Sequence, residues 1–527
     1  MSNGNIKGNN TYIKNKNMCC FSSSTVLGGT WNAELAYSNW FSFKNDCILD
    51  VNKKFISGTN NEQMLHNILL FNNIIFNEGI YYFEGNFNLK NGQTINGNNA
   101  TFKFKYKNKY SSALNINKLE NVILTNLTII GWKQESNDTT QHSHGISIIG
   151  SNNIYINNIH SLYFLGDGIY VGYSDDIISK NIILSNVINK YNYRQGLSIT
   201  GVDVMSVENS EFSYTSGTLP QAGIDIEPNN NEICTNIVFN NIKCINNIGN
   251  AFLFSGNDNN NINNITINNI YIVNNNNNIG ISIRKCKNCT ISNFEIKAND
   301  GYGIVFNDSI IKNINIINGK IIGNSQTKTG LFWSNITESK NIILSNIEIA
   351  GFGNYGLQLV DNSKIDNFVL KDLFVHNCYH NISIFGNEVI NVRVQNVRTS
   401  NVGLDLNNIK YPNWTFGHDR RIQTDIKTLI NYDNIVSGAS EDRPILNESY
   451  LGFQFFDTTI KKIIYWNTSY WVDSNGNSVN SLKQGTTQQR PTDVKAGFYY
   501  FDTTLNKPIW KKDDTTNVWI DAMGAKV

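Results

Sequence analysis

The 527-residue sequence predicts an all-β solenoid, in which short strands wind into a parallel β-helix. Hydrophobic residues make up 40% of the chain and charged residues 16%, which supplies material for a core and argues against disorder. Asparagine, a poor residue for helix interiors, is abundant, and so is isoleucine, which favours strands. A motif of one small residue followed by apolar, variable and apolar residues also recurs along the chain, and such repeats decide the architecture.

This motif recurs at eleven anchor positions, spaced by about 26 residues, a period typical of solenoids. Alternating segments with Asn, Ser or Asp at the bends lie between the anchors, so each period holds about three strands. Such a unit cannot bury its apolar face alone, so successive units should stack around one interior. Asparagines at matching bends should form hydrogen-bonded ladders. The anchors are Gly145, Gly168, Gly196, Gly223, Ala251, Gly280, Gly303, Gly330, Gly356, Asn381 and Gly403.

The repeat is flanked by segments of other kinds. A short amphipathic helix should cap the open strand edges at the start of the solenoid. Two tandem copies of a small β module, with matching residues 45 to 48 positions apart, end the chain. Their tryptophans could stack on sugar rings, or form cores that modules this small need. The predicted segments are an N-terminal segment at 1–60, the capping helix at 61–73, the β-helix at 74–410, a transition segment at 411–436, and the modules at 437–480 and 481–527.

Charge and cysteine content exclude several functional classes. The 43 basic and 42 acidic side chains leave a net charge of +1, so no bias toward nucleic acid is expected. No apolar run approaches the roughly 18 residues that span a bilayer, and no secretory signal is visible, so we expect synthesis in the cytoplasm without membrane insertion. Cys286 and Cys289 form a lone Cys-x-x-Cys, and His142 and His144 have no apparent third ligand. No metal site is therefore predicted.

Titratable residues gather in four consecutive coils, between residues 142 and 228. Strand alternation places Asp225 and Glu227 on one outward face, about 6.6 Å apart along the backbone. Asp167 belongs to the coil two strands away, at about 9.6 Å. Inverting glycosidases hold their two carboxyl groups about 6.5 to 9.5 Å apart. We therefore predict a catalytic site with Asp167 as general acid and Asp225 or Glu227 as general base.

Polar residues in the neighbouring turns are predicted to bind the sugar: His144, Tyr170, Arg194 and Gln195. Structural alternatives remain for the carboxyl groups. Asp167 shares parity with inward Ile169, so it points outward only if the preceding turn breaks the alternation. Otherwise it would accept hydrogen bonds from backbone amides of the turn. Asp225 could instead form a structural ion pair with Arg194.

Two features of the chain resemble known protein families. The succession His144-Gly-Ile, Gly166-Asp-Gly-Ile-Tyr-Val, Arg194-Gln-Gly and Ala222-Gly-Ile-Asp-Ile-Glu-Pro resembles right-handed parallel β-helix proteins of the pectate-lyase-like superfamily, especially phage tail spikes. The modules that end in Trp519-Ile-Asp-Ala-Met-Gly resemble those of tail proteins from phages that infect gut Bacteroidetes, including crAss-like phages. The resemblance covers residues 70 to 527. It implies a trimeric spike of the virion tail that contacts other tail proteins through its N-terminus.

Such spikes bind, and often cleave, capsular or lipopolysaccharide glycans. The expected function is hydrolysis of a bacterial surface polysaccharide, capsule or O-antigen, without a cofactor. The paired aspartates of the pectin hydrolases are absent, since Gly166-Asp-Gly stands at the related position. Two alternatives stay open. One is a non-catalytic receptor-binding fibre. The other is a polysaccharide lyase, which would use calcium and is partly matched by Arg194, Asp225 and Glu227.

The resemblance suggests three copies, and the sequence adds a candidate contact surface. Leu253, Val305 and Phe332 occupy outward positions of the anchor strands and would be exposed in a monomer. An exposed apolar stripe usually marks an interface. A long turn of the same chain could cover the stripe instead.

Overall fold

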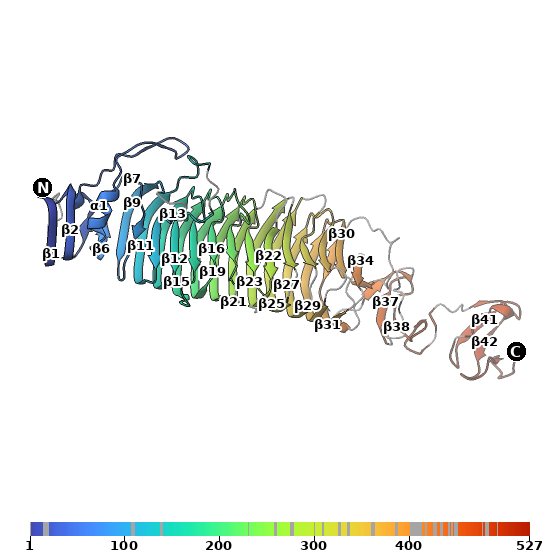
Figure 1. Cartoon of the computed structure of the whole chain (residues 1–527). Helices are drawn as coiled ribbons and strands as arrows, with labels where there is room; N and C mark the ends of the chain where they lie inside the picture. Colours follow the sequence, from blue (N-terminus) through green and yellow to red (C-terminus); the bar gives the residue numbers. More distant parts are fainter. Residues whose placement is uncertain are drawn as a thin grey trace.

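The structure is a computed structural model, and it is a long rod with the N-terminus at one end and two small modules at the other (Figure 1). Strands account for 60% of it and helices for 4%. The described residues are 2–13, 21–106, 111–137, 141–229, 231–257, 261–273, 279–299, 301–307, 310–324, 328–334, 338–359, 364–384, 388–400, 414–416, 419–424, 429–432, 436–440, 443, 446, 452–476, 478–479, 484–492 and 494–527.

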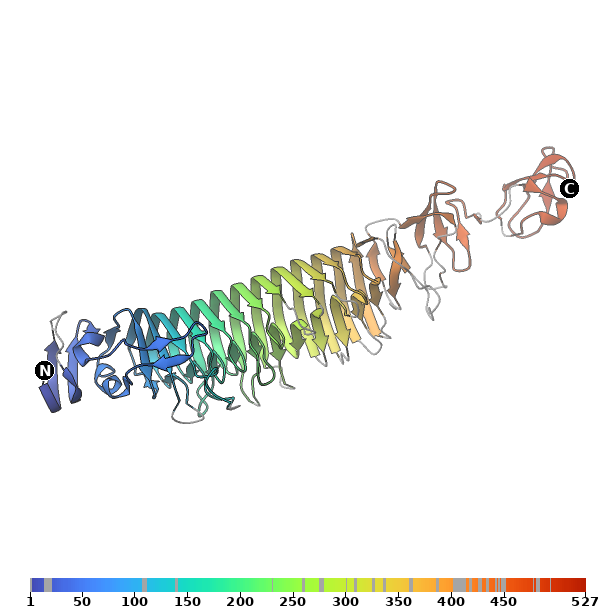
Figure 2. The same ribbon diagram turned by 90° about the horizontal axis from the view of Figure 1, so that it is seen from above.

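The rod is a parallel β-solenoid of about 10 turns, which confirms the predicted fold class. Each turn contains one short and one long strand, and each strand pairs in parallel with its equivalent in the next turn (Figures 1 and 2). Ten of the eleven anchors lie at the start of short strands, and Gly403 lies outside the described residues.

The short strands form one sheet. They are β8 (Phe87–Asn88), β10 (Leu114–Asn117), β12 (Ile146–Ile149), β14 (Ile169–Gly172), β16 (Leu197–Ile199), β18 (Ile224–Ile226), β20 (Phe252–Ser255), β22 (Ile279–Arg284), β24 (Tyr302–Asn307), β26 (Leu331–Ser334), β28 (Tyr355–Leu359), β30 (His380–Ile384) and β34 (Asp419–Thr424), with β33 (Trp414–Phe416) antiparallel at the end.

The long strands form the other faces of the solenoid. They are β9 (Thr94–Phe104), β11 (Glu120–Ile130), β13 (Asn152–Leu162), β15 (Ser179–Lys190), β17 (Val202–Ser213), β19 (Cys234–Ile245), β21 (Ile262–Val273), β23 (Cys286–Asn299), β25 (Ile310–Gly323), β27 (Glu338–Ala350) and β29 (Lys364–His376), followed by the shorter β31 (Glu388–Gln395), β32 (Arg398–Ser400) and β35 (Leu429–Tyr432).

Asparagine bends divide each long strand into two faces. Asn153 and Asn158 of β13, for example, have positive φ, a conformation that asparagine tolerates better than most residues. Their side-chain amides donate to the equivalent asparagines of β11, at 3.1 Å to Asn121 and 2.8 Å to Asn126. Similar bonds recur in later turns, so the predicted ladders are confirmed. They account for much of the asparagine excess without any functional role.

The anchor glycines are required by close contact between turns. A Cβ atom at Gly168 would lie 2.8 Å from the carbonyl oxygen of Gly196 and 2.5 Å from Nδ2 of Asn192, which is fully buried. Gly196 and Gly223 meet the next turn in the same way. The small residue that opens each motif therefore lets neighbouring backbones approach each other.

The N-terminal residues pack against the start of the solenoid. They form β1 (Ser2–Ile13), β2 (Phe21–Ala33), β3 (Ala36–Tyr37), a 3-10 helix η1 (Ser38–Phe41), β4 (Ile48–Leu49), β5 (Phe55–Ser57), α1 (Glu62–Ile68), β6 (Asn73–Ile75) and β7 (Ile80–Phe83). The predicted capping helix is α1, which is shorter than expected. Trp31 and Trp40 belong to the same apolar core as the first turns. The segment boundary near residue 60 stays a prediction, although this core crosses it.

Each C-terminal module is a small sheet. The strands are β36 (Val436–Gly438), β37 (Gln454–Asp457), β38 (Lys462–Trp466) and β39 (Trp471–Val472), then β40 (Gln484–Gly485), the 3-10 helix η4 (Thr487–Gln489), β41 (Tyr499–Asp502), β42 (Lys507–Lys511) and β43 (Trp519–Ile520). The duplication extends to a buried ion pair, Arg443 with Asp457 and Arg490 with Asp502. Trp466, Trp471 and Trp519 lie in the cores, whereas Trp510 is half-buried.

The apolar stripe predicted at Leu253, Val305 and Phe332 is wrong in its main feature. Val305 is only 4% exposed, because Phe332 occupies the adjacent position in the next turn. Leu253 and Phe332 are half-buried, and the ring of Phe332 stacks on Tyr302. A different column, on the long strands, contains exposed apolar residues together with polar ones. Its apolar members have exposed fractions of 37% to 42% and are Ile123, Tyr155, Ile183, Val238 and Ile343.

The close contact at the anchors gives a first prediction. Gly168→Ala should lower the stability of the fold by about 1–3 kcal/mol, because the added methyl group must displace buried backbone. Thermal unfolding at a fixed heating rate will measure the change. Gly28→Ala is the matched control, because no atom lies within 4 Å of the Cβ position there. Equal melting temperatures for both variants would contradict the proposed role of the anchors.

Candidate functional site

The predicted site residues lie on four stacked turns and the short strands that follow them. The turns are joined by backbone hydrogen bonds, from the amide of Gly145 to the carbonyl of Asp167 and from the amide of Gly168 to the carbonyl of Gln195, each 2.9 Å long. In this part of the solenoid the turns extend from one side of the rod (Figure 2). Parallel stacking therefore brings residues that are about 25 residues apart in sequence into contact.

Asp167 is fully buried, and the side chains of Arg194 and His144 lie next to its carboxyl group. Its Oδ2 lies 3.3 Å from Nη1 of Arg194 and 3.2 Å from Nδ1 of His144. The Asp167 backbone amide donates to the same His144 nitrogen at 3.0 Å. The carboxylate therefore does not accept from turn amides, and the ion pair of Arg194 is with Asp167. The alternative pairing of Arg194 with Asp225 is not observed.

Asp225 is also fully buried, whereas the strand pattern predicted an exposed carboxylate. The side chain points outward from β18, but the preceding turn covers it, and Nε2 of Gln195 donates to its Oδ2. Arg194 in turn donates to Oε1 of Gln195 at 2.9 Å. One polar network thus links His144, Asp167, Arg194, Gln195 and Asp225.

The pKa of Asp225 is raised well above its ordinary value. Burial is the main cause, and the nearby negative charge of Glu227 is the second. Glu227 is half-buried and lies closer to solvent. The raised pKa favours the protonated form of Asp225.

Two oxygens of the network accept no hydrogen bond from the described residues. They are Oδ1 of Asp167 and Oδ1 of Asp225, and both are buried. A buried acceptor without a donor costs about 1–3 kcal/mol. Both oxygens are therefore prepared to accept a donor from water or from a bound molecule.

Tyr170 forms an aromatic wall beside this network. Its ring stacks on His144 with centroids 5.0 Å apart, and its hydroxyl lies 2.9 Å from Oγ1 of Thr200. Burial raises its pKa, so the phenol keeps its proton at neutral pH. The tyrosine can therefore offer a ring face or a neutral hydroxyl to a ligand.

Glu227 opens into a polar cleft of about 560 Å³. The register of the short strands extends from Glu227 to Ser255 and then to Arg284 in the next two turns. We did not predict Arg284 and Lys285 from sequence. Following the column one position beyond each motif would have found Arg284. The cleft is lined by Glu227, Pro228, Asn229, Ser255, Gly256, Asn257, Arg284 and Lys285.

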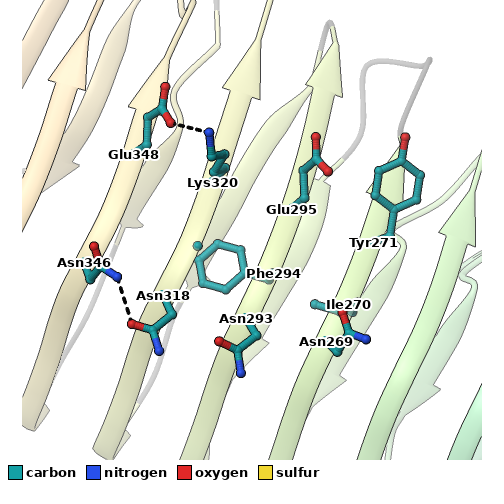
Figure 3. A pocket seen from close by; sticks show the side chains of 11 residues that line it. Asn269, Ile270, Tyr271, Asn293, Phe294, Glu295, Asn318, Lys320, Asn346 and Glu348 are labelled. Atoms are coloured by element: carbon teal, nitrogen blue, oxygen red, sulfur yellow. Dashed lines mark hydrogen bonds and ion pairs between the residues drawn. The ribbon is translucent and has the colours of Figure 1, made fainter.

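A second hollow, of about 510 Å³, lies on the long strands β21 to β27 (Figure 3). In this hollow, the acidic residue Glu348 is neutralised by two basic side chains. Glu348 lies 2.8 Å from Nζ of Lys320 and 3.2 Å from His376, and the bond to Lys320 is the main reason that its pKa is lowered. A lowered pKa does not suit a proton donor. Of the two hollows, the cleft at Glu227 is therefore the better candidate for acid and base chemistry.

The described part of the chain contains no group of three or more His, Cys, Asp or Glu side chains that could hold a metal ion. Cys286 and Cys289 are buried in the core, and burial lowers the pKa of His142. Within the same residues no helix is long and apolar enough to cross a membrane.

Comparison with known proteins does not assign the chain to a family. No protein family model matches the chain. The uncharacterized protein YclG of Bacillus subtilis (strain 168) is 32% identical over 132 residues, which are 22% of this chain and 23% of that protein. The chain thus spans about a quarter of its curated relative.

Several solved structures are similar in architecture. The A-module of mannuronan C-5 epimerase AlgE6 from Azotobacter vinelandii is 13% identical, with a TM-score of 0.49, over 70% of this chain and 100% of that one. PfbA, a surface adhesin of Streptococcus pneumoniae, also has 13% identity and a TM-score of 0.49, over 67% and 92%. Tailspike protein 3 of bacteriophage CBA120 has 12% identity and a TM-score of 0.38, over 85% and 70%. These likenesses concern the fold alone.

Replacement of Asp225 by asparagine and replacement of Asp167 by asparagine should change the stability of the fold in opposite directions. In the folded chain the raised pKa of Asp225 disfavours its ionised form, so stability should fall as pH rises from the unfolded value near 4 toward the folded pKa. Asp225→Asn should remove this decline and raise the melting temperature relative to wild type at pH 8. Asp167→Asn should lower stability by about 1.5–3 kcal/mol, because Arg194 loses its charged acceptor. Melting curves between pH 5 and 8 test both, and an unchanged decline in Asp225→Asn would contradict the assignment.

Proposed function

We propose that the protein is a phage tail spike that binds a bacterial surface polysaccharide, capsule or O-antigen, and hydrolyses it at the cleft beside Glu227. The observation that carries the proposal is the position of two carboxyl groups on β18, with Asp225 buried in the polar network and Glu227 lining a polar cleft. The sequence resemblance to tail spikes supports the virion location and the class of substrate.

The electrostatics favour roles opposite to those first predicted. A general acid needs a raised pKa, and Asp225 has one, so the Asp225–Glu227 pair is the proton donor to the glycosidic oxygen, with Glu227 nearest the substrate. Asp167 forms an ion pair with Arg194, and its Oδ1 has no donor among the described residues. Asp167 is therefore the base that accepts a proton from the attacking water.

The remaining predicted residues position these groups and the sugar. Arg194 and Gln195 connect the two aspartates, and His144 accepts a hydrogen bond from the backbone amide of Asp167. Tyr170 supplies a ring face suited to a sugar. Hydrolysis in this arrangement needs no metal ion. A calcium-dependent lyase and a non-catalytic receptor-binding fibre are the alternatives that product analysis separates.

Cleavage tests the proposal directly. Incubation with capsule from a susceptible host should release oligosaccharides with new reducing ends. Glu227→Gln and Asp225→Asn should each reduce the rate by about 100-fold or more while binding persists, because only proton transfer is lost. Glu348→Gln, on the other face, is the matched control and should leave the rate unchanged. Full activity of Asp225→Asn would sink the site assignment, and unsaturated products that absorb ultraviolet light would indicate a lyase.

We further propose that the spike is a homotrimer that attaches to other tail proteins through its N-terminal end. Exposed apolar residues on the long strands support a lateral contact, because Ile123, Tyr155 and Ile183 lie side by side in three successive turns and water disfavours such a patch. Val238 and Ile343 occupy the same column further along, beyond polar members.

Light scattering tests the assembly. A mass of three chains of 59.5 kDa is expected, and Ile183→Asp should shift it toward one chain. Val51→Asp is the control, because Val51 is 93% exposed outside the column. A wild-type mass of one chain at micromolar concentration would rule the trimer out.

A further inference from the structure

Lys133 joins the four stacked turns of the candidate site. It lies in the first turn, the connection from β11 to β12, and its backbone amide donates to the carbonyl of Tyr163 in the second turn at 2.9 Å. Its Nζ lies 2.9 Å from the carbonyl oxygen of Tyr191 and 3.3 Å from that of Asn192, both in the third turn. In the fourth turn, Nζ lies 2.8 Å from the carbonyl oxygen of Ser216 and 3.0 Å from its Oγ.

The charge of Lys133 is directed at the backbone and not at a carboxylate. Among the described residues Lys133 has no ion pair, and burial lowers its pKa to about 8, so the amine keeps its proton at neutral pH. An ammonium group has three N–H donors and no acceptor, which suits a point where four oxygens meet. The ring of Tyr193, 5.7 Å from Nζ, adds a cation–π contact. The ammonium group is therefore the donor on which carbonyls of two different turns converge.

The third turn also carries the residues that link the two aspartates of the site. Arg194 donates to Asp167 at 3.3 Å, and Gln195 donates to Asp225. Both lie within four residues of the carbonyls that Lys133 contacts. A shift at the start of this turn would therefore move both donors relative to their carboxyl groups.

Backbone hydrogen bonds hold the third turn to its immediate neighbours. The amide of Tyr193 donates to the carbonyl of Phe164 at 2.8 Å, and the amide of Ser216 donates to the carbonyl of Asn192 at 3.1 Å. Lys133 adds a direct link from the first turn, which is two strand spacings away, or about 9.6 Å. The side chain therefore fixes the third turn to a part of the solenoid that its own backbone does not reach.

We infer that Lys133 is a positioning residue of the candidate site, whose ammonium group holds the turn at 191–195 so that Arg194 and Gln195 reach the two aspartates. Its role in the reaction rests on the proposed function, which it deepens by naming a residue outside the polar network that controls the order of that network. The order of the turn can be measured without any substrate.

Hydrogen exchange of the full chain measures that order. Lys133→Ala should make the amides of Tyr193 and Arg194 exchange at least tenfold faster, because the start of their turn loses its donor. Amides of β27, far along the solenoid, should exchange as in wild type. Lys180→Met is the control, because Lys180 pairs with Asp203 of the next turn, at 4.0 Å, from the other end of β15. It should leave exchange in the turn unchanged.

Chemical rescue separates the role of the charge from a loss of packing. Propylammonium supplies an ammonium group on a stem of the length that Lys133→Ala removes, so it should slow exchange in the turn at least fivefold. Propan-1-ol has a similar shape without the charge and should not. If Lys133→Ala does not fold, Lys133→Met keeps the stem and removes only the charge, and the confinement of faster exchange to the turn then decides.

Cleavage of host capsule connects the turn to the reaction. Where the wild type releases oligosaccharides, Lys133→Ala should lower kcat at least tenfold, and propylammonium should restore it. Wild-type exchange in both Lys133 variants, faster exchange spread over the whole solenoid, equal rescue by propan-1-ol, or undiminished cleavage despite a mobile turn would each overturn the inference. Absence of cleavage by the wild type would instead reject the proposed hydrolysis, and the exchange and rescue results would still decide whether Lys133 positions the turn.

Discussion

Parallel hydrogen bonding between successive turns is the constraint on which the other features depend. It places each turn one strand spacing from the next, about 4.8 Å away. Equivalent positions therefore form columns, and a column can bury isoleucine, bond asparagine to asparagine, or bring charges together. The anchor glycines maintain this spacing, because a side chain at Gly168 would meet the backbone of the next turn. Chemistry in this molecule is thus built from columns of residues that are distant in sequence.

The candidate site shows what such columns do to charged residues. Asp167 and Asp225 are two turns apart, and Arg194 and Gln195 lie between them. The turn that supplies the connecting side chains also excludes water from both carboxyl groups. Burial then separates their behaviour, since Asp167 has Arg194 as a counterion and Asp225 faces the like charge of Glu227. The same stacked turns therefore place one buried carboxyl group beside a cation and the other beside a second carboxyl group.

Periodicity in the sequence was sufficient to predict the solenoid, its asparagine ladders and the turns where polar residues cluster. It could not predict burial. Asp225 has the outward parity of an exposed residue, yet the side chain of Gln195 covers it. Val305 likewise has outward parity, and Phe332 in the next turn shields it. Strand parity gives only the direction of a side chain, whereas its exposure depends on the size of its neighbours and on where turns fold back.

The same limitation hid Arg284, because it became relevant only when register placed it beyond Ser255 and opposite Glu227. Comparison of the two hollows explains why register matters for function. On the long strands, Glu348 and Lys320 occupy adjacent turns, and they neutralise each other at 2.8 Å (Figure 3). In the cleft, a small residue separates Glu227 from Arg284, so the opposite charges stand two turns apart. Adjacent opposite charges stabilise the solenoid surface, whereas side chains two turns apart can line the two sides of a cleft.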